Sequence, residues 1–572
     1  MYPKTLDSSQ LKIIHGIPPV LTENDRCALD TEWFRMDENR LHRPTGDFAC
    51  ATFCSDGRTV YFVTEPKDLA KAFKNISKAV LIFANAKFDL FHLRRLVDIP
   101  DRERVWDVLL IDQIMWSGYY DSFSLADLAR RYLHLYVEKE TRKEFYQADH
   151  MTREMMEYSA IDPVATWRIY QCQKEQIGDT ELDLWADIEE PFLWTLLDMP
   201  GMPMDKDAWV ELYKRNRADA VAIQNRYPEI KLSSNDQVGK EILKQGFKLP
   251  KTPTGKPSTV EDDIKIYASK SQFIRDVLEF RGKSKLASTY GEGWVSRDLI
   301  EADGKIYSEF RQIGAATGRL SSSNPNVENI PVRETPDFRK CFIASKGKVL
   351  IDADWSAQEP RITAYLSEDE KMIQIFKDKQ DVYIGAAKLM FNWKLDKKDP
   401  RRSGRMKPTV LGACYGLTEY GMEKKYGVPK AEGKKLLDKF FQTFDGIKRW
   451  KDAQQRKHDY VETVYGRKYW LNPWKIGSDN NALNSPVQGT ASDAMKIAGA
   501  KFRKRILDAG YHDRVSIINF IHDEILVEAE KKLEKWAMKN LREVMLEVAE
   551  STHPGIPADV EVKSGHSWAE CH

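Results

Sequence analysis

The sequence contains little cysteine and no long uninterrupted hydrophobic run. Its 572 residues include seven cysteines, scattered along the chain without CxxC pairs, so neither a disulfide-linked scaffold nor a cysteine metal centre is expected. No apolar run approaches the roughly 18 residues of a membrane span, and the first residues lack the apolar segment of a secretory signal. We therefore expect a cytoplasmic protein with reduced thiols and no membrane partner.

The net charge is only +1, but the two signs are unevenly distributed. Residues 1–190 carry 24 Lys and Arg against 33 Asp and Glu, whereas the rest of the chain carries 64 against 54. Opposite balances of this kind indicate two parts with different tasks, the basic one facing a polyanion. Chance drift of surface charge is the alternative. With 42% hydrophobic residues, the chain can form several folded cores.

Turn-rich stretches divide the chain, and acidic residues accompany its predicted strands. Clusters of Pro, Gly, Ser and Asn mark breaks at 190–206, 250–258 and 321–336. Short apolar runs that carry or adjoin acids predict strands at 27–33, 349–354, 517–521 and 525–527, the last two as a hairpin. The sequence therefore predicts a mixed α/β chain of several domains.

One group of acids lies in the amino-terminal part. Asp30 and Glu32 are two apart on a predicted strand, so both leave the same face. Asp89 lies in a helical pattern, and Tyr158 and Asp162 have the i, i+4 spacing of one helix face. Four carboxylates could hold two hard cations about 3.5–4 Å apart, as in phosphodiester hydrolysis, while a tyrosine orients the attacking water. Each piece alone is more often structural, for example as an exposed strand edge.

Taken together, in this order and at these separations, the five residues resemble the tyrosine variant of the Asp-Glu-Asp-Asp exonuclease family. The resemblance spans about residues 20–175. It implies a ribonuclease-H-like domain over residues 1–190 with 3′→5′ exonuclease activity. In such a domain the four acids bind the metal ions and Tyr158 takes part in catalysis.

A second pair of acids lies in the basic part. Asp354 closes a predicted strand, and Asp523 lies at the turn of the predicted hairpin. If the two strands are neighbours, these carboxylates could bind two Mg²⁺ ions that activate a hydroxyl and neutralise a triphosphate. Two unrelated strand-end aspartates are the alternative.

Five segments of this part resemble the motifs of family A DNA polymerases, the DNA polymerase I group. In chain order they are a primer–template loop (317–333), motif A (349–361), the fingers helix of motif B (407–416), a template-positioning segment (484–490) and motif C (518–528). The resemblance implies a right-hand polymerase domain over residues 191–572, laid out as in the large fragment of the group or a compact phage replicase. Its parts would be a thumb at about 200–300, a palm at about 301–365 and 480–572, and fingers at about 366–479.

The resemblance also assigns metal and DNA contacts. Asp354 and Asp523 would be metal ligands through their carboxylates, and Trp355 through its carbonyl. The primer–template would be held near its terminus, where minor-groove acceptors are common to all correct base pairs. The residues expected there are Arg319, Asn326, Asn329, Arg333, Asn484, Gln488 and His522.

Four further residues would form the nucleotide site. Lys407 would offer its ammonium group to the triphosphate, and Leu411 and Tyr415 would line the pocket above it. Glu359 would fill the space of a ribose 2′-hydroxyl and so exclude ribonucleotides.

The nucleotide site departs from the family pattern at three positions. Ser403 stands where the family usually has an arginine, and either Arg402 or Arg405 could replace it. Tyr383 stands where the family usually has a histidine at the base of the fingers. Leu411 stands where much of the family has Phe or Tyr.

We therefore predict a DNA-templated DNA polymerase that replicates DNA with deoxynucleoside triphosphates by two-metal-ion phosphoryl transfer and proofreads with a 3′→5′ exonuclease. Mg²⁺, two ions per active site, is the expected cofactor, with Mn²⁺ as a substitute. Primer–template DNA and deoxynucleoside triphosphates are the expected partners of a monomeric enzyme, and helicase or single-strand-binding partners are left open. Residues 231–290, with 10 Lys and 2 Arg against 7 acids, suit a DNA-tracking thumb.

Two alternatives remain. The chain could be a 3′→5′ exonuclease whose carboxy-terminal half only clamps DNA, or a DNA-binding scaffold without activity. The scaffold is disfavoured because six uncompensated carboxylates near DNA would weaken binding. Primer extension separates the polymerase from both alternatives.

Overall fold

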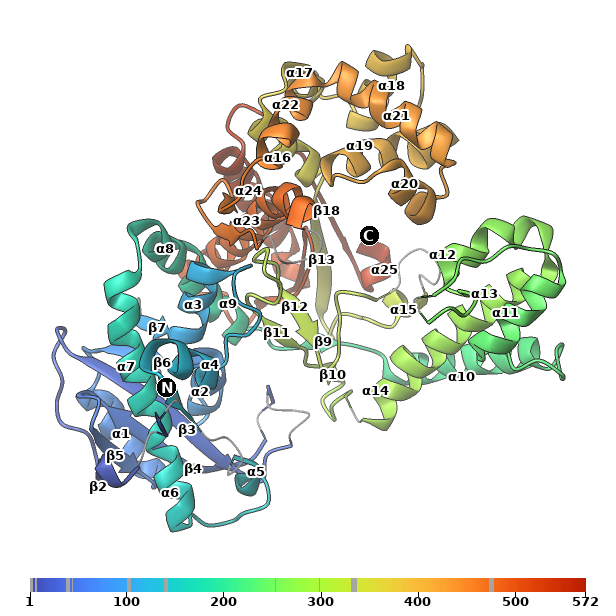
Figure 1. Ribbon diagram of the computed structural model, residues 1–572. Helices are drawn as coiled ribbons and strands as arrows, with labels where there is room; N and C mark the ends of the chain where they lie inside the picture. Colours follow the sequence, from blue (N-terminus) through green and yellow to red (C-terminus); the bar gives the residue numbers. More distant parts are fainter. Residues whose placement is uncertain are drawn as a thin grey trace. The chain divides into compact units, whose positions relative to one another are not determined.

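The computed structural model describes the chain except for short stretches, and the chain divides into two compact units (Figure 1). The stretches outside the description are residues 1–3, 6–7, 38–41, 44, 100–103, 138–141, 253, 298, 331–336, 473–477 and 572. Unit 1 consists of Met1–Pro200, Tyr307–Asn326 and Gln454–Ile517. Unit 2 consists of Gly201–Ile306, Val327–Ala453 and Ile518–His572. Unit 1 thus combines the first 200 residues with two later segments of the chain. The boundary expected near residue 190 assigned those two segments to the polymerase domain.

A six-stranded mixed sheet forms the centre of unit 1. Its order is β2-β5-β4-β3-β6-β7, with β3–β4 and β4–β5 antiparallel and the remaining pairs parallel. Nearly every residue of β3 is buried, which explains why its sequence is largely apolar on either side of the polar stretch Asp30–Glu32. The strands are β2 (Lys12–His15), β3 (Arg26–Phe34), β4 (Asp47–Cys54), β5 (Thr59–Val63), β6 (Val80–Phe83) and β7 (Val105–Asp107).

Helices and two small hairpins complete unit 1. The longest helix comes from the late segment of the chain and packs with α9. The helices include α1 (Pro66–Asn75), α2 (Ala86–Leu93), α3 (Val108–Trp116), α6 (Arg153–Ser159), α7 (Ile161–Gln176), the π-helical turn η3 (Trp185–Glu189), α9 (Glu190–Leu197) and α23 (Ser478–Asp508). The hairpins are β11 (Glu309–Arg311) with β12 (Ser321–Ser323), and β14 (Tyr460–Glu462) with β15 (Lys468–Trp470).

A four-stranded sheet of order β16-β17-β13-β18 carries the second group of acids. Strand β13 pairs antiparallel with both β17 and β18, and α24 packs on β13 and β18. The predicted strand at 349–354 and the predicted hairpin are therefore confirmed. The elements are β13 (Lys348–Trp355), β16 (Val515–Ile521), β17 (Glu524–Glu530), β18 (Val560–Gly565) and α24 (Glu534–Thr552).

The remaining helices of unit 2 form two further cores. One core lies among the helices that the sequence predicts as a thumb, and the other among those predicted as fingers. The first set includes α10 (Lys206–Gln224), α11 (Asn235–Lys244) and α13 (Gln272–Lys285). The second includes α16 (Gln358–Ser367), α17 (Glu370–Lys377), α18 (Val382–Phe391), α19 (Lys407–Cys414), α20 (Glu419–Tyr426), α21 (Lys430–Thr443) and α22 (Asp445–Gln454). Throughout the described residues, no helix combines the length and apolarity that crossing a membrane requires.

Candidate active sites

Two of the expected exonuclease acids lie on strand β3. The pairing of β3 with β4 sets Asp30 opposite Thr52 and Glu32 opposite Cys50, and the register shifts only after Glu32. Both acids therefore leave the same face of the sheet, as their spacing predicts. Glu32 is only 8% exposed, so its charge lies where a cation would interact with it strongly.

Asp89 lies on α2, beside the part of β3 that β6 does not cover. Parallel pairing of β3 with β6 includes only Arg26–Ala28. Farther along, Oδ1 of Asp89 accepts the backbone N–H of Thr31 at 3.0 Å and its hydroxyl at 2.7 Å. These bonds hold the buried Asp89 carboxylate against the stretch of strand that carries Asp30 and Glu32. Thr31 was not singled out from the sequence, where its place between two acids was the only signal.

The last two members of this group differ from the prediction. Tyr158 and Asp162 do not share one continuous helix, because α6 ends at Ser159 and a turn at Ala160 separates it from α7. Pro163 has no N–H to donate to a carbonyl four residues earlier, which interrupts the helical hydrogen bonds at this point. Both side chains are buried.

The end of α6 and the acids of β3 both influence the same thiol, that of Cys50. Burial, and then the charges of Glu32 and Asp30, hold the pKa of the Cys50 thiol well above its ordinary value. The side chain of Ser159 at the end of α6 lowers the pKa of the same thiol. Strands β3 and β4 and the α6 terminus therefore meet around these carboxylates.

The second group of acids is assembled by the pairing of β13 with β17. This register sets Asp354 directly opposite Glu524, and the backbone N–H of Trp355 donates to the carbonyl of Asp523 at 3.4 Å. The hairpin turn places His522 in the left-handed region with φ 56°. The two aspartates, 169 positions apart in the sequence, therefore lie at adjoining strand ends, as the hypothesis of neighbouring strands requires.

Several of these acids influence one another's ionisation. Burial, and then the charges of Asp523, Glu524 and Asp352, raise the pKa of Asp354 to about 8. Neighbouring carboxylates in a site of low dielectric disfavour one another's ionisation. A divalent cation would reverse this effect, because it favours the charged form of each ligand.

Two buried residues that pair with Glu524, Arg339 and Trp568, were not predicted from the sequence. Glu524 accepts a hydrogen bond from the indole N–H of Trp568 at 2.6 Å. It also forms an ion pair with Arg339 at 3.4 Å. The Arg339 guanidinium also lies 3.8 Å from the centre of the Trp568 ring. Arg339 therefore offsets the negative charge of Glu524 within the sheet. The adjacency of Glu524 to Asp523 was visible in the sequence, whereas its partners were not.

The structure brings Lys407 and Arg402 to one tyrosine. The Lys407 ammonium lies 5.9 Å and the Arg402 guanidinium 5.2 Å from the centre of the buried Tyr383 ring. Arg402 also donates through Nε to Asp381 at 3.0 Å, and Asp381 caps the helix that carries Tyr383. Lys407 and Arg402 thus lie around one ring, with Arg402 also ion-paired to Asp381. Ammonium and guanidinium groups of this kind bind phosphate.

Of the two arginines that flank Ser403, only one joins this cluster. Arg405 donates through Nε to Glu432 at 2.6 Å, so its charge is engaged with α21. Residues 402–406 form a π-helical turn before α19.

The other nucleotide-site residues lie close by in unit 2. Burial raises the pKa of Tyr383, and the charge of Glu359 raises it further, so the first turn of α16 is within electrostatic reach of the cation cluster. Leu411 packs against the core of the second helix set while remaining partly exposed. Tyr415 is the C-cap of α19 rather than a helical residue, and it too is partly exposed.

The expected DNA contacts are distributed over both units. Trp355, expected as a metal ligand through its carbonyl, donates its indole N–H to the Met545 carbonyl at 3.0 Å. Its side chain is thus engaged within unit 2, and its main-chain carbonyl is the group expected to bind the metal. Arg333 lies outside the described residues. Unit 1 carries Arg319, Asn326, Asn484 and Gln488, and unit 2 carries Asn329 and His522.

Both groups of acids offer oxygen donors, which suit hard divalent cations. Within the described ranges, no three or more His, Cys, Asp or Glu side chains already stand in the arrangement of a metal site. A magnesium ion typically takes only one or two protein carboxylates and completes its shell with water and substrate phosphates. The pair Asp354 and Asp523 fits that requirement.

Two segments of the chain match known protein families. Residues 208–570 match DNA polymerase family A, and residues 20–177 match a family described as 3′-5′ exonuclease. The first match covers more than half of the chain. Together the two matches run in the order expected from the motifs, an exonuclease domain followed by a family A polymerase domain.

Individual relatives point the same way. DNA polymerase I of Caldicellulosiruptor bescii is 31% identical over 409 residues, covering 68% of this chain and 47% of that protein. The thermostable DNA polymerase I of Thermus filiformis is 30% identical over 444 residues, covering 73% of this chain and 52% of that protein. This chain therefore spans about half the length of these curated relatives.

Among solved structures, the POL domain of Pol1 from M. smegmatis, in complex with DNA primer-template and dNTP, aligns with a TM-score of 0.82 at 25% identity. The alignment covers 98% of this chain and 100% of that one.

Proposed function

This chain belongs to DNA polymerase family A, and on this premise we propose that it extends a primer 3′ end along a DNA template and removes mispaired ends with a 3′→5′ exonuclease. Its substrates would be primer–template DNA and deoxynucleoside triphosphates, the ligands named for the M. smegmatis relative. Its task would be DNA replication, carried out by a monomer.

The observation that carries the polymerase proposal is the pairing of β13 with β17. It joins Asp354 to Asp523 at one sheet end and places Glu524 opposite Asp354. Burial and mutual repulsion raise the pKa of Asp354 to about 8, so the site is arranged for a positive charge. A sheet that served only to clamp DNA would gain nothing from acids concentrated in this way.

Proteins of these families use divalent metal ions, and we propose Mg²⁺, two ions per active site, with Mn²⁺ as a substitute. Asp354 and Asp523 would hold them in unit 2, with the carbonyl of Trp355, and Asp30, Glu32, Asp89 and Asp162 in unit 1. When bound, such ions activate the attacking oxygen and neutralise charge on the phosphate.

The side chains around Tyr383 would bind the nucleotide. Lys407 and Arg402 lie around the same ring and would attract the triphosphate as two fixed positive charges. Glu359, within electrostatic reach of that ring, would occupy the volume of a 2′-hydroxyl and so select deoxyribonucleotides.

The residues of unit 1 would perform proofreading. Thr31 holds the Asp89 carboxylate through two hydrogen bonds, so this ligand would be oriented before the substrate arrives. Tyr158, buried at the end of α6, would orient the attacking water.

A primer-extension assay tests the proposal. On a matched, end-labelled primer–template with all four deoxynucleoside triphosphates, the protein should lengthen the primer, and chelation of divalent ions should stop both extension and shortening. Added Mg²⁺ should restore both activities. Shortening without any extension, at every nucleotide concentration, would instead support the exonuclease that only clamps DNA.

A further inference from the structure

A group of buried charged residues in unit 1 includes none of the expected catalytic acids. Its centre is Glu189, the last residue of η3, which is 0% exposed. One carboxylate oxygen of Glu189 accepts Arg467 at 2.5 Å and Lys496 at 2.6 Å. The other accepts the side-chain amide of Gln312 at 2.6 Å. Three segments far apart in the chain thus converge on one carboxylate.

A second buried acid closes the network. Asp493, on α23, accepts Nε of Arg467 at 2.8 Å and the hydroxyl of Thr463 at 3.0 Å. Two acids and two bases are therefore enclosed together. Burial raises the pKa of Glu189, but Lys496 and Arg467 more than offset this, so the pKa lies below its ordinary value. Replacing buried ion pairs by well-packed apolar residues is often neutral for stability. Stability alone therefore does not explain why these four charges are buried together.

The network touches the loop that precedes β12. The hydroxyl of Ser492, on α23, donates to the Gly318 carbonyl at 2.9 Å. Gly318 has φ 87°, and a Cβ there would lie 2.9 Å from Cδ of Arg467, so a glycine is required for the loop to rest on the arginine. A Cβ on Gly489 would likewise lie 2.8 Å from the Thr317 carbonyl. Loop and helix are therefore in close contact.

Residues expected to bind DNA adjoin these contacts. Arg319 directly follows Gly318, and Gln488 directly precedes Gly489, with Asn484 one turn earlier on α23. Strand β11, which this loop joins to β12, is tied to α2 of unit 1, because Lys87 of α2 donates to the Phe310 carbonyl. The network thus contacts both DNA-binding segments of unit 1, although none of its own charges is exposed.

We propose that Glu189 is a positioning residue for the polymerase reaction, because it holds the loop of Arg319 and the helix of Gln488 in the relation that binds the primer–template. This inference rests on the proposed function. It assigns to Glu189, which lies in unit 1 beyond the segment 20–177 that matches the exonuclease family, a role in binding DNA during synthesis that is independent of the exonuclease acids.

Glu189→Gln tests the proposal, since it removes the charge and preserves the shape of the side chain. In an exonuclease-deficient background (Asp30→Ala with Glu32→Ala), the KM for primer–template should rise about tenfold, while the KM for deoxynucleoside triphosphate and kcat change by less than about twofold. With the exonuclease acids restored, the rate on single-stranded DNA should also stay within about twofold.

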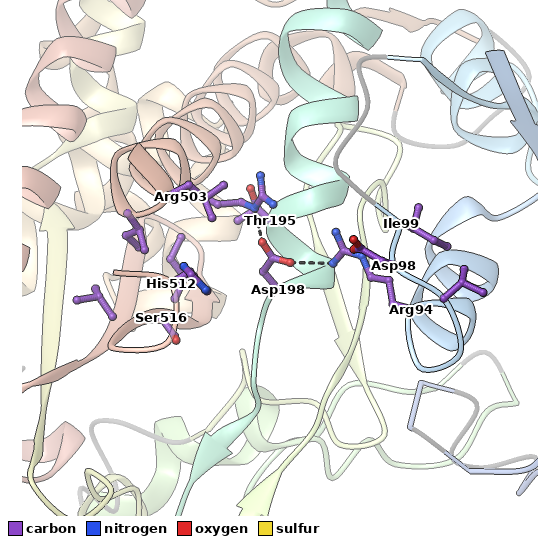
Figure 2. Close-up of a pocket in the computed structure, with 13 residues that line it drawn as sticks. Arg94, Asp98, Ile99, Thr195, Asp198, Arg503, His512 and Ser516 are labelled. Carbon is purple, nitrogen blue, oxygen red and sulfur yellow. Dashed lines mark hydrogen bonds and ion pairs between the residues drawn. The ribbon is translucent and has the colours of Figure 1, made fainter. Parts of the chain in front are cut away.

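Asp198 offers a matched control. It too receives two cations, Arg94 at 2.8 Å and Arg503 of α23 at 2.6 Å, as Figure 2 shows beside a cavity of about 480 Å³ that both arginines line. Its side chain is 37% exposed, and the two arginines with which it pairs both lie outside the Gly318 loop. Asp198→Asn should therefore leave the KM for primer–template within about twofold of the parent.

A double-mutant cycle separates positioning from a general structural role. If Glu189 acts through the loop, adding Glu189→Gln to Arg319→Ala should raise the KM for primer–template much less than it does alone, because the effects of coupled residues do not add. Full additivity, or an equal effect of Asp198→Asn, would overturn the proposal.

A milder variant covers the case in which Glu189→Gln does not fold. Ser492→Ala removes only the hydrogen bond to the Gly318 carbonyl, and it should raise the KM for primer–template about threefold. An unchanged KM would overturn the proposal. Absence of primer extension by the parent protein would instead refute the proposed function, so the two failures are distinguishable.

Discussion

Thr31→Val should impair the exonuclease selectively. Valine has nearly the shape of threonine, and Thr31 is only 3% exposed, so the change replaces one hydroxyl by a methyl group in a closed site. The hydroxyl donates to Asp89 at 2.7 Å and accepts the indole N–H of Trp33 at 3.1 Å. The backbone bond from Thr31 to Asp89 remains, so Asp89 loses one of the two hydrogen bonds that it accepts from Thr31.

The size of the effect follows from the charge of the acceptor. A hydrogen bond to an ionised group contributes about 1.5–3 kcal/mol. If that whole contribution orients Asp89 in the transition state, the exonuclease rate should fall about 10- to 150-fold, since each 1.36 kcal/mol is tenfold. The polymerase acids lie in unit 2, so extension of a matched primer should keep its parental rate.

The assay is single-turnover degradation of end-labelled single-stranded DNA, accompanied by thermal unfolding to show that the variant is folded. Thr52→Val is the matched control, because it removes a hydroxyl from the neighbouring strand that donates only to the Asp30 carbonyl, at 3.2 Å. A rate for Thr31→Val within about twofold of the parent, or an equal loss in Thr52→Val, would refute the reasoning.

Three further predictions concern residues that the sequence already indicates. Asp30→Ala with Glu32→Ala should abolish 3′ degradation and leave matched extension largely intact; loss of both activities in a folded variant would contradict separate sites. Glu359→Ala should raise the kcat/KM ratio of ribonucleotide to deoxyribonucleotide incorporation, because space for the 2′-hydroxyl opens; an unchanged ratio would exclude this role. Leu411→Tyr, in the exonuclease-deficient background, should improve dideoxynucleotide use about tenfold, or about 1.4 kcal/mol of transition-state stabilisation, because the phenol offers a hydrogen bond that leucine cannot. Equal selectivity would show that residue 411 does not contact the sugar.

Strands that carry acids could be predicted from the sequence because their signals are local. The apolar runs around Asp30 and Asp354 have the length and the Val, Ile and Leu content of buried strands, and the structure contains both strands. The hairpin around Asp523 has the same local origin. The i, i+4 spacing of Tyr158 and Asp162 predicted a single helix, whereas the structure assigns them to the successive helices α6 and α7, because Pro163 interrupts the helical hydrogen bonds between them.

The contacts that complete the sites could not be predicted in this way. Arg467 and Lys496 lie 278 and 307 positions from Glu189, and no periodicity or spacing relates residues so far apart. Arg339 likewise lies 185 positions from Glu524. These ion pairs form only when the sheets and helices of each unit pack together. Taken alone, each member is a charged residue of the kind usually found on a protein surface.

The most direct test of the account is primer extension by Asp354→Asn on a template whose primer ends in a mismatch. The parent protein should first shorten the primer and then extend it past the mismatch position. Asp354→Asn should still shorten the primer at the parental rate but extend it at no detectable rate, because its exonuclease acids are intact while its polymerase acids are not. Extension by Asp354→Asn at a rate near that of the parent would contradict the assignment of Asp354 and Asp523 as the polymerase centre.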